Sequence, residues 1–364
     1  MFFSNKIYSD RIEKLRQSME KEKMDGVVIP PGPNFFYFTG METESMERFA
    51  ALLVTDRRVC VLCPKLMEEQ VINESWIEDI VSWKDGENPF GYLEDLFKSK
   101  RNIGIDGGIP YSHFTEMQSA LHRDFSLSDS MVSELRIVKG REELDAIQEA
   151  TRLSEKSLAD VLTHIQEGIT EKQFARALEN KFLENGLDSP AFPTIVAFGR
   201  NGAMPHHNAD NTELKKGDSV VIDYGGKYHG YSSDNTRTFF YDKPRDQMLE
   251  IYEYVREANE STRDAINSKT SYAAMDKIAR NIIDSKGYGD KFIHRLGHGL
   301  GISVHESPYL VPENTRAVIV HSVFTIEPGI YINNLGGVRI EDTNYFDGTK
   351  CVPFNKMSRE LKIL

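Results

Sequence analysis

Four carboxylates stand next to apolar runs in the second half of the 364-residue chain. Asp223 ends the run VVID and Glu327 ends FTIE, while Asp234 and Glu341 stand in the following runs SSDNTRTFF and GGVRIEDTNYF. An unpaired carboxylate buried among apolar side chains is strongly disfavoured in its charged form. Two divalent cations about 3.5 to 4 Å apart would remove this cost. A single carboxylate at such a position more often belongs to a solvent-exposed turn or strand edge. Four of them in a repeated arrangement favour a two-metal site.

Histidines that can complete such a site gather in the segment FIHRLGHGLGISVHESP, which carries His294, His298 and His305. Glycines are interleaved with them, and glycine lets the backbone approach a ligand or an ion closely. A further pair, His206 and His207, stands in GAMPHHN. A single histidine is more often structural than catalytic, but a cluster of this kind points to a functional site.

A repeated plan of two helices followed by two strands accounts for where these residues stand. In the first copy, a long amphipathic helix over 141–165 precedes a helix that begins at Thr170, which forms a capping box with Gln173. In the second copy, a helix over 246–266 precedes one that begins at Ser271. Each copy then continues into two strands that bear two carboxylates. We therefore expect two antiparallel carboxylate-bearing hairpins that face each other across a pseudo-two-fold axis.

The first third of the chain alternates helical and strand-like segments, which is typical of an α/β layer domain. The expected strands are GVVIP, AALLVT, RRVCVLC, DIVSW and NIGID. The expected helices lie near 9–24, 66–74, 88–98 and 112–122. The aromatic segment NFFYF is also expected to contribute a core strand. The pattern changes near Ser133, so we expect an N-terminal α/β domain over 1–132 and a second domain over 133–364.

Composition excludes several classes of partner. Lys and Arg total 44 against 56 Asp and Glu, and the resulting formal charge of -12 repels nucleic acid and anionic membranes. The N-terminal stretch has no apolar signal-peptide core and no apolar run is long enough to span a bilayer, so we expect a soluble cytoplasmic protein.

Cys60 and Cys63 form a C-x-x-C, but no second ligand pair follows, and side chains three apart on a strand point to opposite faces. We expect buried strand cysteines rather than a zinc or redox site.

The ordered set of motifs resembles the M24 "pita-bread" metallopeptidases, which include prolidase, aminopeptidase P and methionine aminopeptidase. The resemblance covers nearly the whole chain. It rests on two aspartates in IDYGGKYHGYSSDNTR, a histidine in GHGLG, a glutamate in EPG and a glutamate in VRIED. The fold it implies is an α/β N-terminal domain followed by an α+β pita-bread catalytic domain with internal duplication.

The resemblance also implies roles for individual residues. Asp223 would bind one metal ion, Asp234 and Glu341 would bridge two ions, and His298 with Glu327 would hold the second. This oxygen-rich donor set suits Mn(II) or Co(II) more than structural zinc, although Zn(II) stays possible. Glu327 would also act as general base on the attacking water.

Further residues are placed near the substrate by the same resemblance. His206 and His305 would donate protons or hydrogen bonds, and His294 matches another active-site histidine. His207 matches the family position less well and is left outside this set. Two roles are equally supported for Arg339. It would orient Glu341 or the substrate, or it would be an ordinary strand-edge arginine.

The expected reaction is hydrolysis of the peptide bond before proline. A full domain ahead of the catalytic one resembles prolidase and aminopeptidase P, and the overall length favours a dipeptidase. The resemblance to the family also implies a homodimer. Tyr309, in HESPYL, stands where dipeptide-specific prolidases often have a basic residue, which favours aminopeptidase P instead. A non-catalytic pita-bread binding protein and a metal-free creatinase are remoter alternatives, because both can dispense with the five ligands that this chain retains.

Overall fold

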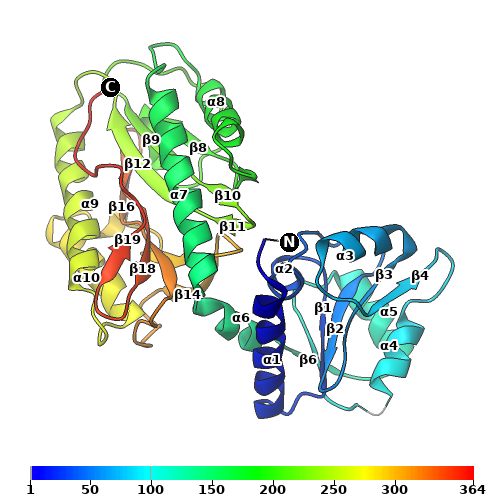
Figure 1. Cartoon of the computed structure of the whole chain (residues 1–364). Coiled ribbons are helices and arrows are strands. Elements are labelled where there is room, and N and C mark those ends of the chain that lie inside the picture. Colours follow the sequence, from blue (N-terminus) through cyan, green and yellow to red (C-terminus); the bar gives the residue numbers. More distant parts are fainter. Residues whose placement is uncertain (1, 99) are drawn as a thin grey trace. The chain divides into compact units, whose positions relative to one another are not determined.

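The computed structural model describes residues 2–98 and 100–364 (Figure 1). It divides the chain into two units, one of which ends at Arg136 while the other begins at Ile137. Within the described residues, no helix combines the length and apolar character that crossing a membrane would require.

The N-terminal unit is built on one mixed six-stranded sheet (Figure 1). In spatial order its strands are β4 (Ile80–Trp83), β3 (Val59–Pro64), β2 (Ala51–Thr55), β1 (Gly26–Ile29), β5 (Ile103–Ile105) and β6 (Phe125–Leu127). Its helices are α1 (Asn5–Lys21), α2 (Pro33–Thr39), α3 (Glu68–Glu74), α4 (Phe90–Phe97), α5 (Tyr111–Leu121) and α6 (Asp129–Ile137). Strand β1 runs antiparallel to β2 and parallel to β5. The five strands and four helices expected in this part of the chain are confirmed, with helix ends shifted by a few residues.

The aromatic segment NFFYF is a helix, so the expectation of a core strand is wrong. It forms α2, with Pro33 at the first helical position and Gly40 as a left-handed cap at φ 78°. Proline is preorganised to begin a helix, and glycine adopts a positive φ without the strain that a Cβ imposes. Phe35, Phe36 and Phe38 are all buried. A short apolar run that is buried on every side shows no periodicity that would separate a helix from a strand.

The cysteines are buried and free, as expected. Cys60 and Cys63 lie in β3, and burial raises the pKa of each thiol to about 11. Neither belongs to a group of potential metal ligands among the described residues. The C-x-x-C is therefore part of the packing of the sheet.

The C-terminal unit carries the repeated plan. Its helices are α7 (Arg141–Leu162), α8 (Glu171–Glu184), α9 (Asp246–Ala265) and α10 (Tyr272–Ser285). One three-stranded sheet consists of β12 (Asn235–Phe240), β9 (Ser219–Tyr224) and β8 (Ile195–Phe198). A five-stranded sheet consists of β14 (Glu306–Leu310), β13 (Gly297–Gly299), β15 (Val323–Ile326), β18 (Asp342–Phe346) and β19 (Cys351–Pro353). The remaining strands are β7 (Ser189–Pro190), β10 (Gly226–Tyr228), β11 (Tyr231–Ser232), β16 (Gly329–Ile332) and β17 (Gly336–Arg339).

The helix starts expected from the sequence are confirmed in this unit. The Thr170 side chain accepts a hydrogen bond from the Gln173 backbone N–H, and the Gln173 side-chain oxygen accepts one from the Thr170 backbone N–H, so the capping box is complete. Ser271 caps α10 by accepting from the backbone N–H of Ala274. These caps satisfy donors that would otherwise be orphaned at the helix ends.

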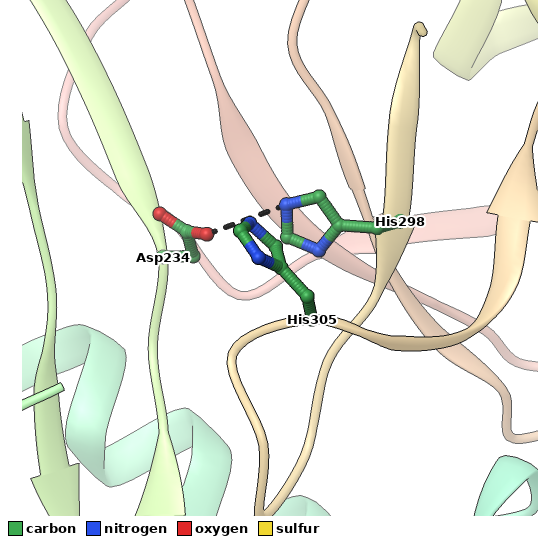
Figure 2. Close-up of side chains that lie close together, drawn as sticks. All are labelled: Asp234, His298 and His305. Carbon is green, nitrogen blue, oxygen red and sulfur yellow. Dashed lines mark ion pairs between the residues drawn. The ribbon is translucent and has the colours of Figure 1, made fainter. Parts of the chain in front are cut away.

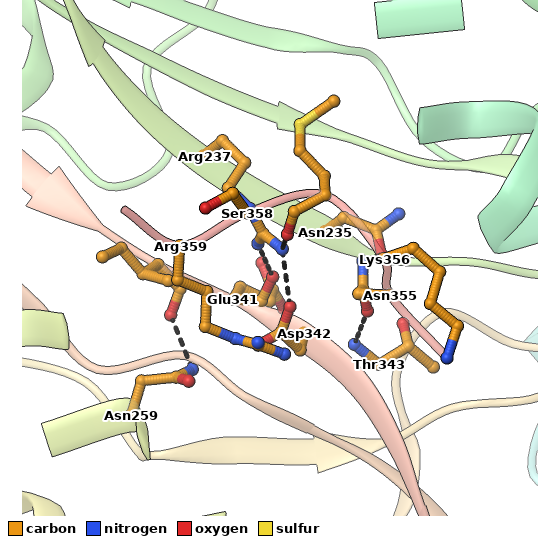
Figure 3. A network of polar contacts seen from close by, with 12 residues as sticks. Asn235, Arg237, Asn259, Glu341, Asp342, Thr343, Asn355, Lys356, Ser358 and Arg359 are labelled. Atoms are coloured by element: carbon orange, nitrogen blue, oxygen red, sulfur yellow. Dashed lines mark hydrogen bonds and ion pairs between the residues drawn. The ribbon is translucent and has the colours of Figure 1, made fainter. Parts of the chain in front are cut away.

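A buried polar network joins the two halves of this unit behind the carboxylates (Figure 3). Thr236 of β12 forms an isolated antiparallel bridge with Glu341, just before β18. The fully buried Arg237 donates to the Glu341 carbonyl at 2.7 Å and to Asp342 Oδ1 at 2.7 Å. Asn355 accepts a hydrogen bond from the Thr343 backbone N–H at 2.8 Å. The network fixes the backbone of β18 beside β12, and with it the position from which Glu341 projects.

Candidate active site

Asp223 and Asp234 come from one antiparallel strand pair. Asp223 lies near the end of β9, and Asp234 directly precedes β12. The register places Asp223 opposite Thr236, two positions after Asp234. The chain between them turns back through β10 and β11, so both carboxylates lie at the same end of the strand pair.

Glu327 and Glu341 come from corresponding junctions in the second half. Glu327 follows β15, and Glu341 lies between β17 and β18. Because β15 pairs with β18 and β16 pairs with β17, the two junctions face each other. The Thr236 hydroxyl donates to Glu341 Oε2 at 2.6 Å, which links this pair to the aspartates.

His298 of β13 lies among the carboxylates. Its Nε2 is 3.2 Å from Glu327 Oε1 and 3.5 Å from Asp234 Oδ2. Figure 2 shows the approach to Asp234, with His305 beside the His298 ring at a centroid distance of 4.2 Å. Three overlapping groups have potential ligand atoms within 4.8 Å of one another: Asp223 with Asp234 and Glu341, His298 with Glu327 and Glu341, and Asp234 with His298 and His305. Glu341 belongs to two of these groups, so the five expected ligands form one continuous cluster.

Most of these carboxylates lie where charge is disfavoured. Burial and then the neighbouring carboxylates raise the pKa of Asp234 and of Glu341 well above the usual range. Burial also raises the pKa of Asp223, although Arg339 opposes the shift. At Glu327 burial acts in the same direction, but the hydrogen bond and the charge of His298 outweigh it and lower the pKa to about 2. The positive charge that Arg339 contributes is therefore too small to compensate four carboxylates.

The donor atoms fit a pair of divalent cations. Asp223 Oδ1 is buried and has no hydrogen-bond partner among the residues that the structure describes. An unsatisfied buried oxygen is costly, and a cation is the partner that four adjacent carboxylates lack. Four carboxylates and one imidazole, without a thiolate, form a hard donor set of the kind that oxygen-preferring divalent ions take.

Arg339 links one of the expected ligands, through Tyr331, to His294. It is only 3% exposed, and its Nη2 donates to Asp223 Oδ2 at 2.7 Å. Its Nη1 donates to the Tyr331 hydroxyl at 3.0 Å, and that hydroxyl lies 2.9 Å from His294 Nε2. Arg339 is therefore a buried residue that orients Asp223, and the interpretation as an ordinary strand-edge arginine is wrong. Tyr331 was not singled out from the sequence, because GIYI reads only as a core strand.

A cavity of about 370 Å³ opens onto this cluster. Its lining includes every site residue that the sequence suggested: His206, Asp223, Asp234, His294, His298, His305, Glu327 and Glu341. An adjoining hollow shares His206 and His305 and is lined on another side by Phe192, Pro193 and Val304. The site therefore combines a highly polar centre with an apolar wall that can receive a small side chain or ring.

His207 pairs with a buried carboxylate, whereas His206 lines the polar cavity. His207 Nε2 lies 2.7 Å from Oε2 of Glu171, the fully buried first residue of α8. The other Glu171 oxygen accepts from Asn201 Nδ2 at 2.9 Å. Glu171 was missed from the sequence because an acidic residue just after a cap is ordinary helix chemistry.

Comparisons with known proteins agree with this geometry. The family described as metallopeptidase family M24 matches residues 145–346, and the creatinase/prolidase N-terminal domain matches residues 11–138. The chain is 36% identical to an Xaa-Pro dipeptidase of Pyrococcus furiosus, over 97% of this chain and 99% of the relative. A prolidase structure from Thermococcus sibiricus superposes with a TM-score of 0.93 at 36% identity, covering 98% of this chain and 99% of that one. An X-Pro aminopeptidase structure from Thermotoga maritima gives a TM-score of 0.85 at 28% identity, covering 96% and 100%.

Proposed function

Because the chain belongs to metallopeptidase family M24, a family of enzymes that depend on two metal ions, we propose that it hydrolyses the Xaa-Pro bond of dipeptides. The observation that carries this proposal is the convergence of four carboxylates, two buried and two partly buried, and His298 on one cavity that three further histidines line. Relatives named Xaa-Pro dipeptidase, matched over nearly their full length, support the choice of bond.

We propose the five clustered residues as the metal ligands. Asp223 would hold one ion, and His298 with Glu327 would hold the other. Asp234 and Glu341 would serve both ions, because each belongs to two of the overlapping groups. The hard donor set supports Mn(II) or Co(II), with Zn(II) as the third ion to test. When bound, the two ions would polarise the scissile carbonyl and make a water molecule between them more acidic.

We assign proton transfer and substrate binding to side chains of this protein. Glu327 would accept the proton of the attacking water, because its carboxylate lines the cavity beside His298, 3.2 Å from Nε2. His206 and His305 line both the polar cavity and the apolar hollow, so they would donate hydrogen bonds to the substrate carbonyl and to the leaving nitrogen. His294, held by Tyr331, would orient the substrate beside Asp223 and Arg339.

Aminopeptidase P activity on longer peptides is the second candidate. Two observations favour it: Tyr309 replaces the basic residue that dipeptide-specific relatives often have, and an X-Pro aminopeptidase shares the fold.

We also propose that the enzyme is a homodimer, to be tested by light scattering.

The deciding experiment compares two substrates with and without metal. Metal-stripped protein would be assayed with Mn(II), Co(II) or Zn(II) on Met-Pro and on Met-Pro-Ala. Cleavage of Met-Pro alone supports a dipeptidase, and cleavage of Met-Pro-Ala at the proline bond assigns aminopeptidase P instead. Failure to cleave either peptide with metal bound would reject Xaa-Pro hydrolysis and favour a binding role. Asp234→Asn serves as the inactive control, since it removes a proposed ligand with little change in volume.

A further inference from the structure

Arg295 stands in the wall of the polar cavity without an anionic partner. It lies between His294 and Leu296 and is partly exposed to the cavity. Among the residues that the structure describes, no carboxylate forms an ion pair with its guanidinium group and no hydrogen bond engages it. Its guanidinium group makes a cation–π contact with the ring of Tyr309, whose centroid lies 4.7 Å from the guanidinium carbon. Tyr309 therefore supports one face of the guanidinium plane and leaves its N–H groups free to bind a ligand.

The backbone that carries Arg295 is held firmly. Arg280 donates to the Phe292 carbonyl at 3.0 Å and to the His294 carbonyl at 3.1 Å, and it is itself paired with Asp276 at 2.8 Å. The Leu296 N–H donates to the same Asp276 at 3.2 Å. Arg295 therefore projects from an ordered segment, which lowers the cost of placing its guanidinium group at a ligand.

The other arginine of the cavity cannot take the same role. Arg339 already donates to Asp223, to the Tyr331 hydroxyl and, through Nε, to Thr236 Oγ1 at 3.0 Å. These bonds occupy both of its terminal nitrogens and its Nε. Arg295 is thus the cavity arginine whose donors remain available.

We propose that Arg295 binds the terminal carboxylate of the proline in an Xaa-Pro dipeptide and so selects dipeptides over longer or amidated peptides. The inference rests on the proposed Xaa-Pro hydrolysis and deepens it. A dipeptide brings a carboxylate into a cavity that already holds four, and such an anion needs a cation with free donors. Arg295 would supply the positive charge that Tyr309 does not supply, and Tyr309 would hold the guanidinium group in place.

The test compares Leu-Pro with Leu-Pro-amide, which differ only at the carboxylate. Arg295→Met should lower kcat/KM for Leu-Pro by about 10- to 100-fold, mainly through KM, because one or two charge-assisted hydrogen bonds are lost. The amide should be cleaved equally by the wild type and the variant. Arg295→Lys should recover part of the loss. Arg176→Met, an exposed arginine on α8, is the matched control and should behave like the wild type.

Two further measurements separate this role from general damage. Free proline should raise the melting temperature of the wild type more than prolinamide does, and Arg295→Met should abolish that difference. In the double variant Arg295→Met with Tyr309→Arg, a cation returns beside the position of Arg295, so selectivity for Leu-Pro should return in part.

Several results would overturn the proposal. Equal losses on Leu-Pro and its amide, or no loss on either, would remove Arg295 from carboxylate binding. A loss confined to Asp-Pro would show that Arg295 faces the side chain of the first residue instead. If the wild type cleaves Leu-Pro while Arg295→Met is unaffected, this inference alone fails; a wild type that cleaves no Xaa-Pro peptide would reject the proposed function together with it.

Discussion

Replacing His207 with alanine should destabilise the C-terminal unit and slow peptide cleavage, although His207 is not a proposed ligand. Its partner Glu171 is fully buried and accepts four hydrogen bonds. They come from the Phe198 N–H at 2.8 Å, Asn201 Nδ2 at 2.9 Å, the Asp210 N–H at 3.0 Å and, on geometry, His207 Nε2 at 2.7 Å. Together these bonds tie the segment around His206 to the start of α8.

The size of the effect follows from the charge on Glu171. A hydrogen bond to a buried charged group contributes about 1.5 to 3 kcal/mol, and the lost imidazole also leaves a cavity. We therefore expect His207→Ala to lower the free energy of unfolding by about 2 to 3 kcal/mol. For a unit of this size that corresponds to a melting temperature roughly 5 to 10 °C lower. Because His206 is the next residue, kcat/KM on Met-Pro should fall by roughly 10-fold or more.

Thermal unfolding followed by circular dichroism and a double-mutant cycle would check this reasoning. His207→Ala, Glu171→Gln and the double variant should show a coupling of about 1 kcal/mol or more, since the residues are in direct contact. His164→Ala, at an exposed position, is the matched control and should change stability by less than about 0.5 kcal/mol. Additive effects of the two substitutions, or a His207→Ala protein as stable and active as the wild type, would refute the idea that the pair anchors the His206 segment.

Three other predictions concern the metal site, the cysteines and a buried ion pair. Chelation should abolish Met-Pro cleavage and lower the melting temperature, and ions at 100 times their Kd should return about 2.7 kcal/mol of stability for each occupied site; full activity in metal-free protein, checked by elemental analysis, would contradict this. Because burial raises the pKa of Cys60 and Cys63 to about 11, native protein at pH 8 should react with a thiol reagent at least about 100-fold more slowly than denatured protein, and rapid native labelling would disprove it. Lys139 Nζ lies 2.9 Å from Glu306 Oε1 with both side chains buried, so Lys139→Met should cost about 3 to 5 kcal/mol in urea unfolding. Adding Glu306→Gln should recover part of that loss, and a fully stable Lys139→Met protein would show that the pair does not matter.

The sequence by itself determined the chemistry of the site and much of the local structure. Local sequence patterns were sufficient to predict those structural features that depend on residues a few positions apart. The capping box of Thr170 and Gln173 is complete in the structure, and the strands that end in Asp223 and Glu327 form as the apolar runs indicated. The order of carboxylates and histidines also identified the family, because a set of ordered motifs is far more specific than any one of them.

Only the tertiary structure decided which residues meet. Thr236 bonds Glu341, Arg339 bonds Asp223, and each contact joins residues more than a hundred positions apart. Such contacts depend on how two strand pairs dock, and no local pattern encodes that docking. The same reason explains the errors and omissions. The prediction of a strand for NFFYF is wrong because burial of its aromatic side chains removes the periodicity that distinguishes a helix from a strand. The partner of His207 is Glu171, whose position at the start of a helix gave no sign of that contact.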